Sequence, residues 1–227
     1  MAGPSPATTW TKCHAPPLKF ASTPQAPRAS TPQPSFMAGL RISSGAHFAF
    51  VHRGTFGDNA HPKPSKYEID ETDHGFVATT VVDIVNPPAA FRVTGTIEPT
   101  TTRTMRNHWY LPFARRMDMS YPSGIRHIII NCATPIDDGR IRLVQLLYRN
   151  DTEDQCPIQT LIDWDAAVVY EDRAILEATD PDAALDLAHR TEAHMTSDRP
   201  GLIMRRRLQE LLKEHNDPEV TRNYAAA

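Results

Sequence analysis

The chain has 227 residues, a formal net charge of −3 and a hydrophobic content of 40%, which fit one domain with a single core better than two. No basic run is long enough to indicate nucleic-acid binding, and no 18-residue apolar stretch occurs, so we expect neither a nucleic-acid partner nor a membrane span. The three cysteines, Cys13, Cys132 and Cys156, are far apart. This spacing excludes a CxxC metal site and argues against a disulfide framework.

The first 36 residues differ in composition from the rest of the chain. They hold eight of its 20 prolines, and such a segment buries too little apolar surface to order itself. We therefore expect a disordered tail over residues 1–38, a folded domain over 39–220 and a second disordered tail over 221–227. No acidic residue precedes Asp58, which is typical of a transit peptide but also fits a linker. The expected location is cytoplasmic, with an organelle as the alternative.

From residue 66 onward the pattern is typical of antiparallel strands. Residues 66–85 predict two strands around the turn residues Asp73, His74 and Gly75. Pro, Ser, Gly and Asp mark turns between the later segments. Because a helical third follows, the sequence predicts an α+β fold in which helices pack on one sheet. Further strands are expected within residues 91–99, 103–120, 124–133 and 139–150.

A helix is expected from Pro157 to about Ala178, with apolar residues at helical spacing. Two acids, Asp165 and Asp172, interrupt this apolar stripe. Asp172 has apolar residues one turn before and one turn after it, so its carboxylate should point toward the core. A buried, unpaired carboxylate costs on the order of several kcal/mol. Asp172 must therefore be paired, protonated or bound to a cation, and either a salt bridge to an arginine or a metal site would satisfy it.

Two histidine pairs have a five-residue spacing: His47 with His52, and His189 with His194. The residues inside the second pair are charged and polar, so we interpret it as two solvated histidines on an exposed helix. The first pair encloses only apolar residues. Five residues of regular helix leave two side chains about 140° apart. His47 and His52 therefore converge on one ion only if the helix ends or distorts between them; otherwise one packs in the core and the other reaches solvent.

Two imidazoles and one carboxylate form the facial triad of non-haem Fe(II) oxygenases, which leaves positions open for O2 and for water or substrate. His47, His52 and Asp172 would supply this set. The segment AHFAFVHRGTFGD resembles the iron-binding segment of Rieske-type aromatic-ring oxygenases, in the branch of vanillate O-demethylase and dicamba monooxygenase. There a His-x4-His pair precedes a Gly-Thr-x-Gly stretch, here Gly54–Gly57, and a late Glu-Asp pair carries the third ligand. WDAAVVYEDRAILEA matches that pair, and the likeness spans roughly residues 44–215.

The resemblance implies a curved antiparallel sheet wrapped on a long C-terminal helix, a START-like helix-grip fold with iron in the cavity between them. It implies an oxidoreductase, a mono- or dioxygenase of aromatic compound catabolism with Fe(II) held by His47, His52 and Asp172. The implied reaction is hydroxylation or oxidative demethylation of an aromatic or apolar small molecule with O2. Family members are often trimers, so the resemblance also implies a homotrimer.

Two features depart from the family pattern. The 227 residues contain no Cys-x-His and Cys-x-x-His pattern, so we expect no [2Fe–2S] site in this chain and an external electron donor of the Rieske or ferredoxin-reductase type. Members usually carry an Asp three residues before the first histidine, where this chain has Ser44. The competing interpretations are a metal-free, START-like carrier of apolar ligands and an inactive, truncated oxygenase. Pocket walls are expected from the strands, with Trp109, Tyr110, Phe113, Ile129 and Leu146 as candidates.

Overall fold

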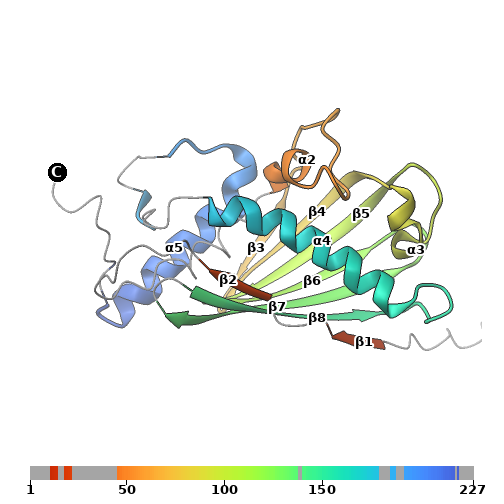
Figure 1. Ribbon diagram of the computed structural model, residues 1–227. Coiled ribbons are helices and arrows are strands. Elements are labelled where there is room, and N and C mark those ends of the chain that lie inside the picture. The colour runs from red at the N-terminus through yellow and green to blue at the C-terminus, as the bar shows by residue number, and fades with distance from the viewer. Residues whose placement is uncertain are drawn as a thin grey trace, which may run out of the picture.

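The computed structural model describes residues 11–14, 18–21, 45–137, 140–178, 185–187, 192–217 and 219. Its main feature is an antiparallel sheet in which β3 to β8 follow one another in chain order. Helix α4 (Ile158–Glu177) lies across one face of the curved sheet (Figure 1). The predicted α+β, helix-grip arrangement is therefore confirmed. The six strands are β3 (Glu68–Thr72), β4 (Gly75–Val85), β5 (Thr100–Tyr110), β6 (Ala114–Ser120), β7 (Arg126–Asp137) and β8 (Arg140–Arg149).

Burial alternates along the central strands, which gives the sheet one inner face. The turn predicted at Asp73–Gly75 joins β3 to β4, and residues 103–120 form two strands rather than one. The inner face of β5 is not purely apolar, because it carries an arginine and an asparagine between hydrophobic side chains. The inward residues of β5 are Arg103, Met105, Asn107 and Trp109.

Residues 91–99 do not form the predicted strand, and that prediction is wrong. A 3-10 turn, η2 (Pro88–Ala90), leads into a short helix, α3 (Phe91–Thr94). The buried side-chain amide of Asn86 donates to two backbone carbonyls beyond the helix, at 2.9 and 2.8 Å. Gly95, in the left-handed conformation at φ 70°, ends α3. These local bonds compete with strand pairing and close the segment into a compact connection.

Two short strands, β1 (Thr11–His14) and β2 (Leu18–Ala21), pair with opposite ends of β8. Both lie within residues 1–38, where the sequence predicts a disordered tail. The other positions of that segment, and all of residues 221–227, lie outside the described residues. The domain boundaries therefore stay predictions.

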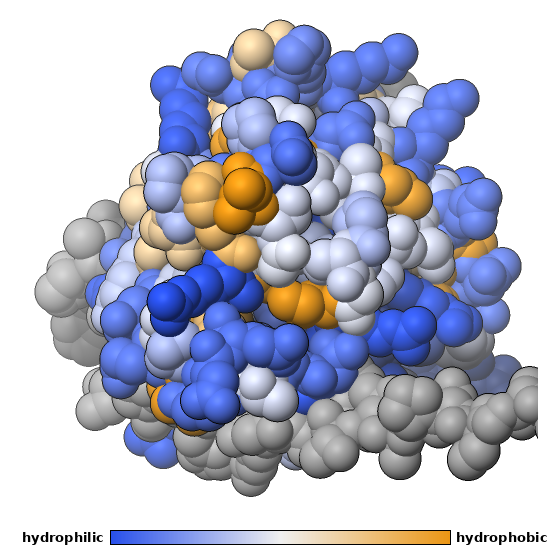
Figure 2. Space-filling view, turned by 90° about the vertical axis from the view of Figure 1, so that its right-hand side faces the viewer, coloured by the Kyte–Doolittle hydropathy of each residue, from blue (hydrophilic) through white to orange (hydrophobic). Residues whose placement is uncertain are grey.

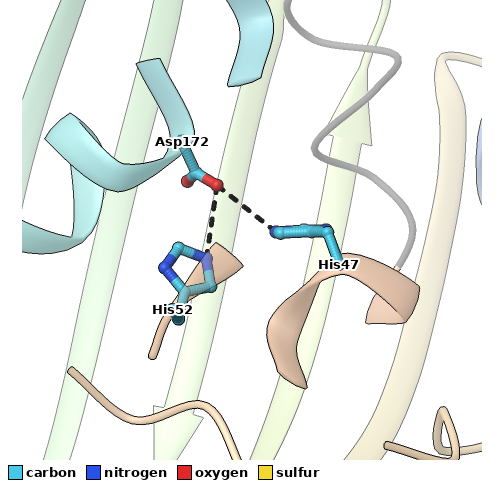
Figure 3. Close-up of side chains that lie close together, drawn as sticks. All are labelled: His47, His52 and Asp172. Atoms are coloured by element: carbon cyan, nitrogen blue, oxygen red, sulfur yellow. Dashed lines mark ion pairs between the residues drawn. The ribbon is translucent and has the colours of Figure 1, made fainter. Parts of the chain in front are cut away.

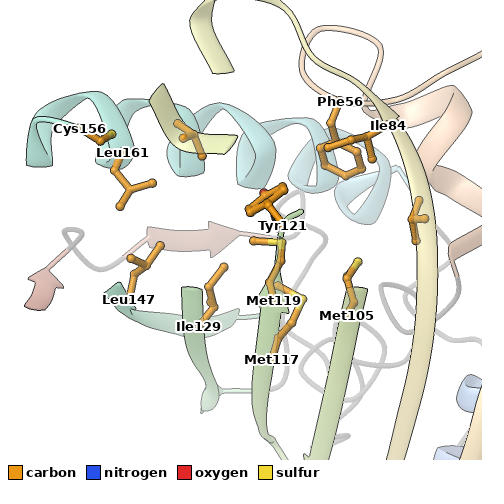
Figure 4. Close-up of a cluster of buried hydrophobic side chains, with 12 residues drawn as sticks. Phe56, Ile84, Met105, Met117, Met119, Tyr121, Ile129, Leu147, Cys156 and Leu161 are labelled. Carbon is orange, nitrogen blue, oxygen red and sulfur yellow. Dashed lines mark hydrogen bonds between the residues drawn. The ribbon is translucent and has the colours of Figure 1, made fainter. Parts of the chain in front are cut away.

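The main core fills the space between the inner face of the sheet and α4 (Figure 4). The predicted helix over 157–178 is confirmed, with its ends within a residue of those expected. Leu161 is the most deeply buried residue of α4, at 1% exposure, and it fixes the helix on the sheet. The core consists of Phe56, Val82, Ile84, Val93, Met105, Met117, Met119, Tyr121, Ile129, Leu147, Cys156 and Leu161.

A second, smaller core joins helix α5 (Arg199–Glu214) to the inner side of β4 and β5. Its hydrophobic residues include Phe76, Trp109 and Leu208. Charged contacts support the same packing, because both Arg206 and Arg207 form ion pairs with Glu71 of β3. Helix α5 is therefore tied to the sheet by both apolar and ionic contacts.

The face of the molecule in Figure 2 is mainly hydrophilic, with separated hydrophobic patches rather than a continuous apolar surface. Among the helices of the described ranges, none combines the length and the apolar character that crossing a bilayer requires. The surface thus agrees with the low overall hydropathy of the sequence.

Candidate metal centre

The two histidines of HFAFVH flank a helix that is only four residues long. His47 closes a 3-10 turn, η1 (Gly45–His47), and α2 (Phe48–Val51) ends directly before His52. His52 has φ −90° and ψ 36°, which are not helical values. The helix end that convergence of the two histidines requires is therefore present, and it frees the two rings from the angle that a continuous helix would impose. Figure 3 shows both rings facing the carboxylate of Asp172.

His47, His52 and Asp172 come together although α4 is more than a hundred residues away in sequence. The Nε2 atoms of His47 and His52 lie 3.3 and 3.2 Å from the same Oδ1 of Asp172. The three ligand atoms all lie within 4.8 Å of one another. Ligands bound at about 2.0–2.2 Å from one ion have such separations. The residues therefore fit a single metal ion held by two nitrogens and one oxygen.

Asp172 faces the core, as its position among apolar residues predicts. Its side chain is 15% exposed. Burial raises the pKa of Asp172, but hydrogen bonds and charge from His47 and His52 outweigh burial, so the pKa lies well below its usual range. The acid is thus held ionised beside the two imidazoles, which is the form that binds a metal.

Glu171 holds the other side of the His52 ring. Its Oε2 lies 3.0 Å from Nδ1 of His52, and the same oxygen accepts a hydrogen bond from Thr55 Oγ1 at 2.6 Å. Its Oε1 accepts from the backbone N–H of Gly54 at 2.8 Å. A carboxylate on Nδ1 fixes the tautomer that leaves Nε2 free to bind a metal. Glu171 therefore orients His52, a role that the sequence analysis did not assign to it.

Aromatic rings pack against both imidazoles, and His52 is shielded from water. Phe56 stacks on His52 with ring centroids 4.4 Å apart, and Phe48 contacts His47 edge-on at 4.8 Å. His52 is only 1% exposed. Electrostatic interactions are stronger in such a water-poor site than in solvent.

A cavity of about 80 Å³ opens beside the three residues, between the inner face of the sheet and α4. It has an apolar middle and polar side chains around it. Apart from Asp165, the sequence did not identify these polar residues, because a polar residue in a strand has no periodicity that separates an inward from an outward position. The apolar middle includes Met105, Met117, Met119 and Ile129, and the polar lining includes Arg103, Asn107, Arg115, His127 and Asp165.

A row of polar side chains crosses the sheet at one end of this cavity. Arg115, Asn131 and Gln145 are direct neighbours on β6, β7 and β8. Arg115 donates to Asn131 Oδ1 from Nε and Nη2, at 3.2 and 2.7 Å. The amide of Asn131 donates to Gln145 at 2.8 Å, and that of Gln145 donates to Asp165 at 3.0 Å. The hydrogen bonds of the row therefore run in one direction, from Arg115 through Asn131 and Gln145 to the carboxyl of Asp165.

The candidate wall residues differ in whether they face the cavity, because side chains alternate between the two faces of a strand. Of the five wall candidates, Trp109 and Ile129 line the cavity, whereas Tyr110 is 46% exposed and points away. In the second histidine pair, His194 is exposed but lies outside any helix, so the helix predicted around it is absent there. His189 lies outside the described residues.

The sequence matches a known family over the same region that builds the site. The profile of the vanillate O-demethylase oxygenase C-terminal domain matches residues 45–214. The chain belongs to this family. The family predicted from the sequence is therefore confirmed. Methylxanthine N1-demethylase NdmA of Pseudomonas putida is 26% identical over 176 residues, which are 76% of this chain and 45% of that protein.

Solved structures share the fold of this vanillate O-demethylase oxygenase C-terminal domain. NdmA of Pseudomonas putida with caffeine has a TM-score of 0.69 at 18% identity, covering 96% of this chain and 59% of that one. Dicamba monooxygenase bound to 3,6-dichlorosalicylic acid has a TM-score of 0.69 at 14% identity, covering 94% and 62%. A dicamba monooxygenase structure with non-heme iron and dicamba has a TM-score of 0.59 at 15% identity, covering 93% and 59%. The chain spans about half to three fifths of these proteins.

Proposed function

We propose that this domain is the catalytic domain of a non-haem Fe(II) oxygenase that hydroxylates or oxidatively demethylates a small aromatic molecule with O2. The observation that carries the proposal is the convergence of two imidazole Nε2 atoms on one carboxylate oxygen beside a cavity. Family membership and the iron named for a dicamba monooxygenase of the same fold support it. His47, His52 and Asp172 would hold the ion, as the sequence predicts.

The chain's own residues have distinct tasks in this proposal. Bound Fe(II) would supply open coordination positions at which O2 is activated. Glu171 keeps Nδ1 of His52 occupied, so that Nε2 faces the ion. Phe48 packs against His47, and Phe56 stacks on His52, which is shielded from water. The apolar middle of the cavity would hold the substrate next to the same ion. Substrate and O2 would then react from fixed positions rather than by a chance encounter.

Electrons for O2 activation have to come from outside these residues. The 227 residues contain no Cys-x-His and Cys-x-x-His pattern. We therefore propose a donor of the Rieske or ferredoxin-reductase type that lies beyond them. Assembly as a homotrimer stays a prediction.

An anaerobic Fe(II) titration tests the proposal. We expect one Fe(II) per chain in the wild type and at least a 100-fold weaker affinity in His47→Ala and in Asp172→Ala, because each change removes one of three protein ligands. His61→Ala is the matched control, since His61 is exposed and pairs only with Asp58 among the described residues. Equal Fe(II) affinity in all four proteins would refute the metal site and favour a metal-free carrier.

A further inference from the structure

Three methionines line the cavity beside the candidate metal centre. Met105 on β5 directly opposes Met119 on β6, and Met117 lies two residues from Met119 on the same inner face of β6. All three are buried, with exposures of 5% for Met105, 8% for Met117 and 6% for Met119. Figure 4 shows their side chains extending from the strands toward α4. These three residues, the cavity methionines, therefore form one cluster of thioethers in the space that the candidate metal ligands also line.

The position of Met117 on β6 brings it near the candidate metal ligands. The preceding inward residue of that strand is Arg115. Burial lowers the pKa of Arg115, and the negative charge of Asp172 opposes this effect, so the guanidinium and the carboxylate lie close enough to interact. Met117 is the next inward residue after Arg115. A small oxidant formed at the metal would therefore arise in the same space as the cavity methionines.

The thioether of methionine is readily oxidised to a sulfoxide. When electrons reach the iron site and no substrate fills the cavity, O2 can take up two electrons and two protons to give hydrogen peroxide. A thioether sulfur then gives two electrons to the peroxide and takes one of its oxygen atoms, and the other oxygen atom leaves as water. Burial protects the cavity methionines from an oxidant in solvent but not from one that forms inside the cavity.

The lining also has hydrogen-bond donors for the oxygen atom of a sulfoxide. Tyr121 Oη donates to Sδ of Met119 at 3.5 Å, and an oxygen on that sulfur would be a better acceptor than the sulfur itself. Tyr121 also hydrogen bonds to Arg103, whose Nε lacks a hydrogen-bond partner among the described residues. A buried polar group is tolerated where it finds such partners. The folded domain can thus hold an oxidised side chain.

We propose that Met105, Met117 and Met119 are the site at which this domain oxidises itself when its iron site handles peroxide in the absence of substrate. The inference rests on the proposed function, because it requires iron at the candidate metal ligands. Each added oxygen atom makes the apolar middle of the cavity more polar, so the oxidised domain should bind an apolar molecule less tightly. The modification is reversible, because sulfoxide reductases return methionine sulfoxide to methionine.

The test follows oxidation of each methionine by peptide mass spectrometry during exposure to hydrogen peroxide. Wild-type protein is compared in three forms: metal-free, loaded with one Fe(II), and loaded with one Zn(II), which binds the same ligand types but has no redox chemistry. We expect Fe(II) to speed oxidation of the cavity methionines at least about tenfold over the other two forms, because the oxidant acts next to them. Met204, which is 3% exposed in the second core, is the buried control and should be oxidised equally slowly in all three.

Two variants show whether the bound iron and the three sulfurs are responsible. His47→Ala should lose the acceleration by Fe(II), whereas Met195, which is 59% exposed, should be oxidised as in the wild type. The combined variant M105L/M117L/M119L replaces the thioethers by side chains of similar volume. It should still bind Fe(II) and should lose the accelerated uptake of oxygen.

Three results would overturn the inference: equal acceleration at Met204 and at the cavity methionines, an equal effect of Zn(II), or acceleration that persists in His47→Ala. Iron content, measured on each sample before peroxide is added, separates the two proposals. Wild-type protein that binds no Fe(II) would refute the oxygenase proposal. Wild-type protein with one Fe(II) per chain but no faster oxidation of the cavity methionines would refute only the inference.

Discussion

Glu171 and Asp172 are adjacent on α4 and contact opposite nitrogens of the same histidine. Asp172 faces Nε2 of His52 and Glu171 faces Nδ1. The sequence predicted the role of Asp172 from an acid among apolar residues. It could not predict that of Glu171, because an acid on a helix flank is usually solvated. Only the folded position of the His52 ring distinguishes Glu171 from the other acids of α4.

Substitution of Glu171 tests whether this contact orients the ring. Glu171→Gln should weaken Fe(II) binding by roughly 10- to 100-fold, because the amide no longer fixes the tautomer of His52 as a carboxylate does. Glu177→Gln, on the same helix and paired with Arg173, should leave the affinity unchanged. Isothermal titration with Fe(II) under anaerobic conditions measures both. Equal affinity in Glu171→Gln and wild type would show that Glu171 has no part in holding the ring.

Asp165 should make the stability of the domain depend on pH. Burial raises its pKa to about 7 from an ordinary 3.8, with partial relief from the Gln145 hydrogen bond and the charge of Arg103. Because the folded pKa lies above the unfolded one, the unfolded state loses its proton first as pH rises. The contribution of Asp165 to stability therefore falls between about pH 4 and pH 7 and stays low above pH 7.

Asp165→Asn should remove this loss of stability above pH 4. The variant should match the wild type in free energy of unfolding at pH 4 and exceed it by roughly 1–4 kcal/mol at pH 8. Asp163→Asn is the control, since Asp163 is exposed on the same helix and bonded to Gln159. Urea unfolding at both pH values provides the measurement. A stability difference that is the same at pH 4 and pH 8 would contradict the raised pKa.

The short helix α2 is the element on which the site depends. Its four residues end where the chain turns back, and the backbone N–H of Gly57 donates to the carbonyl of His52 at 2.7 Å. A Cβ at Gly57 would lie 2.2 Å from the carbonyl oxygen of Phe48 and 2.9 Å from backbone atoms of His52. Because these are backbone atoms, the turn itself would have to move. Gly57, the second glycine of the Gly-Thr-x-Gly stretch, is thus needed because a side chain there would collide with the backbone of Phe48 and His52.

Gly57→Ala should therefore damage the fold and the metal site together. We expect a loss of about 1–3 kcal/mol in the free energy of unfolding and a clear loss of Fe(II) affinity. Gly124→Ala provides the comparison: Gly124 has φ +88° but open space around a Cβ, so it should lower stability by about 1–2 kcal/mol without changing Fe(II) affinity. Intact Fe(II) affinity in Gly57→Ala would mean that the turn does not position the histidines.

Elements with strong periodicity were predictable, and elements governed by local side-chain bonds were not. The helical spacing of the apolar residues predicted α4, and the apolar neighbours of Asp172 predicted that its carboxylate faces the core. The alternation in residues 91–99 was misleading, because Asn86 bonds to the backbone there and holds a helical turn instead. Inward polar residues such as Arg103 depend on strand parity and on which face the helix covers, and neither is visible before the sheet is assembled.

At the scale of the molecule, the sheet brings two segments that are more than a hundred residues apart in sequence to one cavity. The histidines precede β3, the acids lie on the helix after β8, and the strands between them supply the walls. The strands of the sheet follow one another in chain order, so the fold class was predictable from the strand and helix patterns of the sequence. The polar chemistry of the cavity was not, because it comes from side chains on several neighbouring strands.

We propose that His47, His52 and Asp172 together hold one iron ion. Crystals of the protein loaded anaerobically with Fe(II) and measured on both sides of the iron absorption edge test it directly. We expect a single strong anomalous peak about 2.0–2.2 Å from Nε2 of both histidines and from a carboxylate oxygen of Asp172. Well-ordered crystals with no anomalous peak at these three residues, or with iron bound only elsewhere, would contradict it.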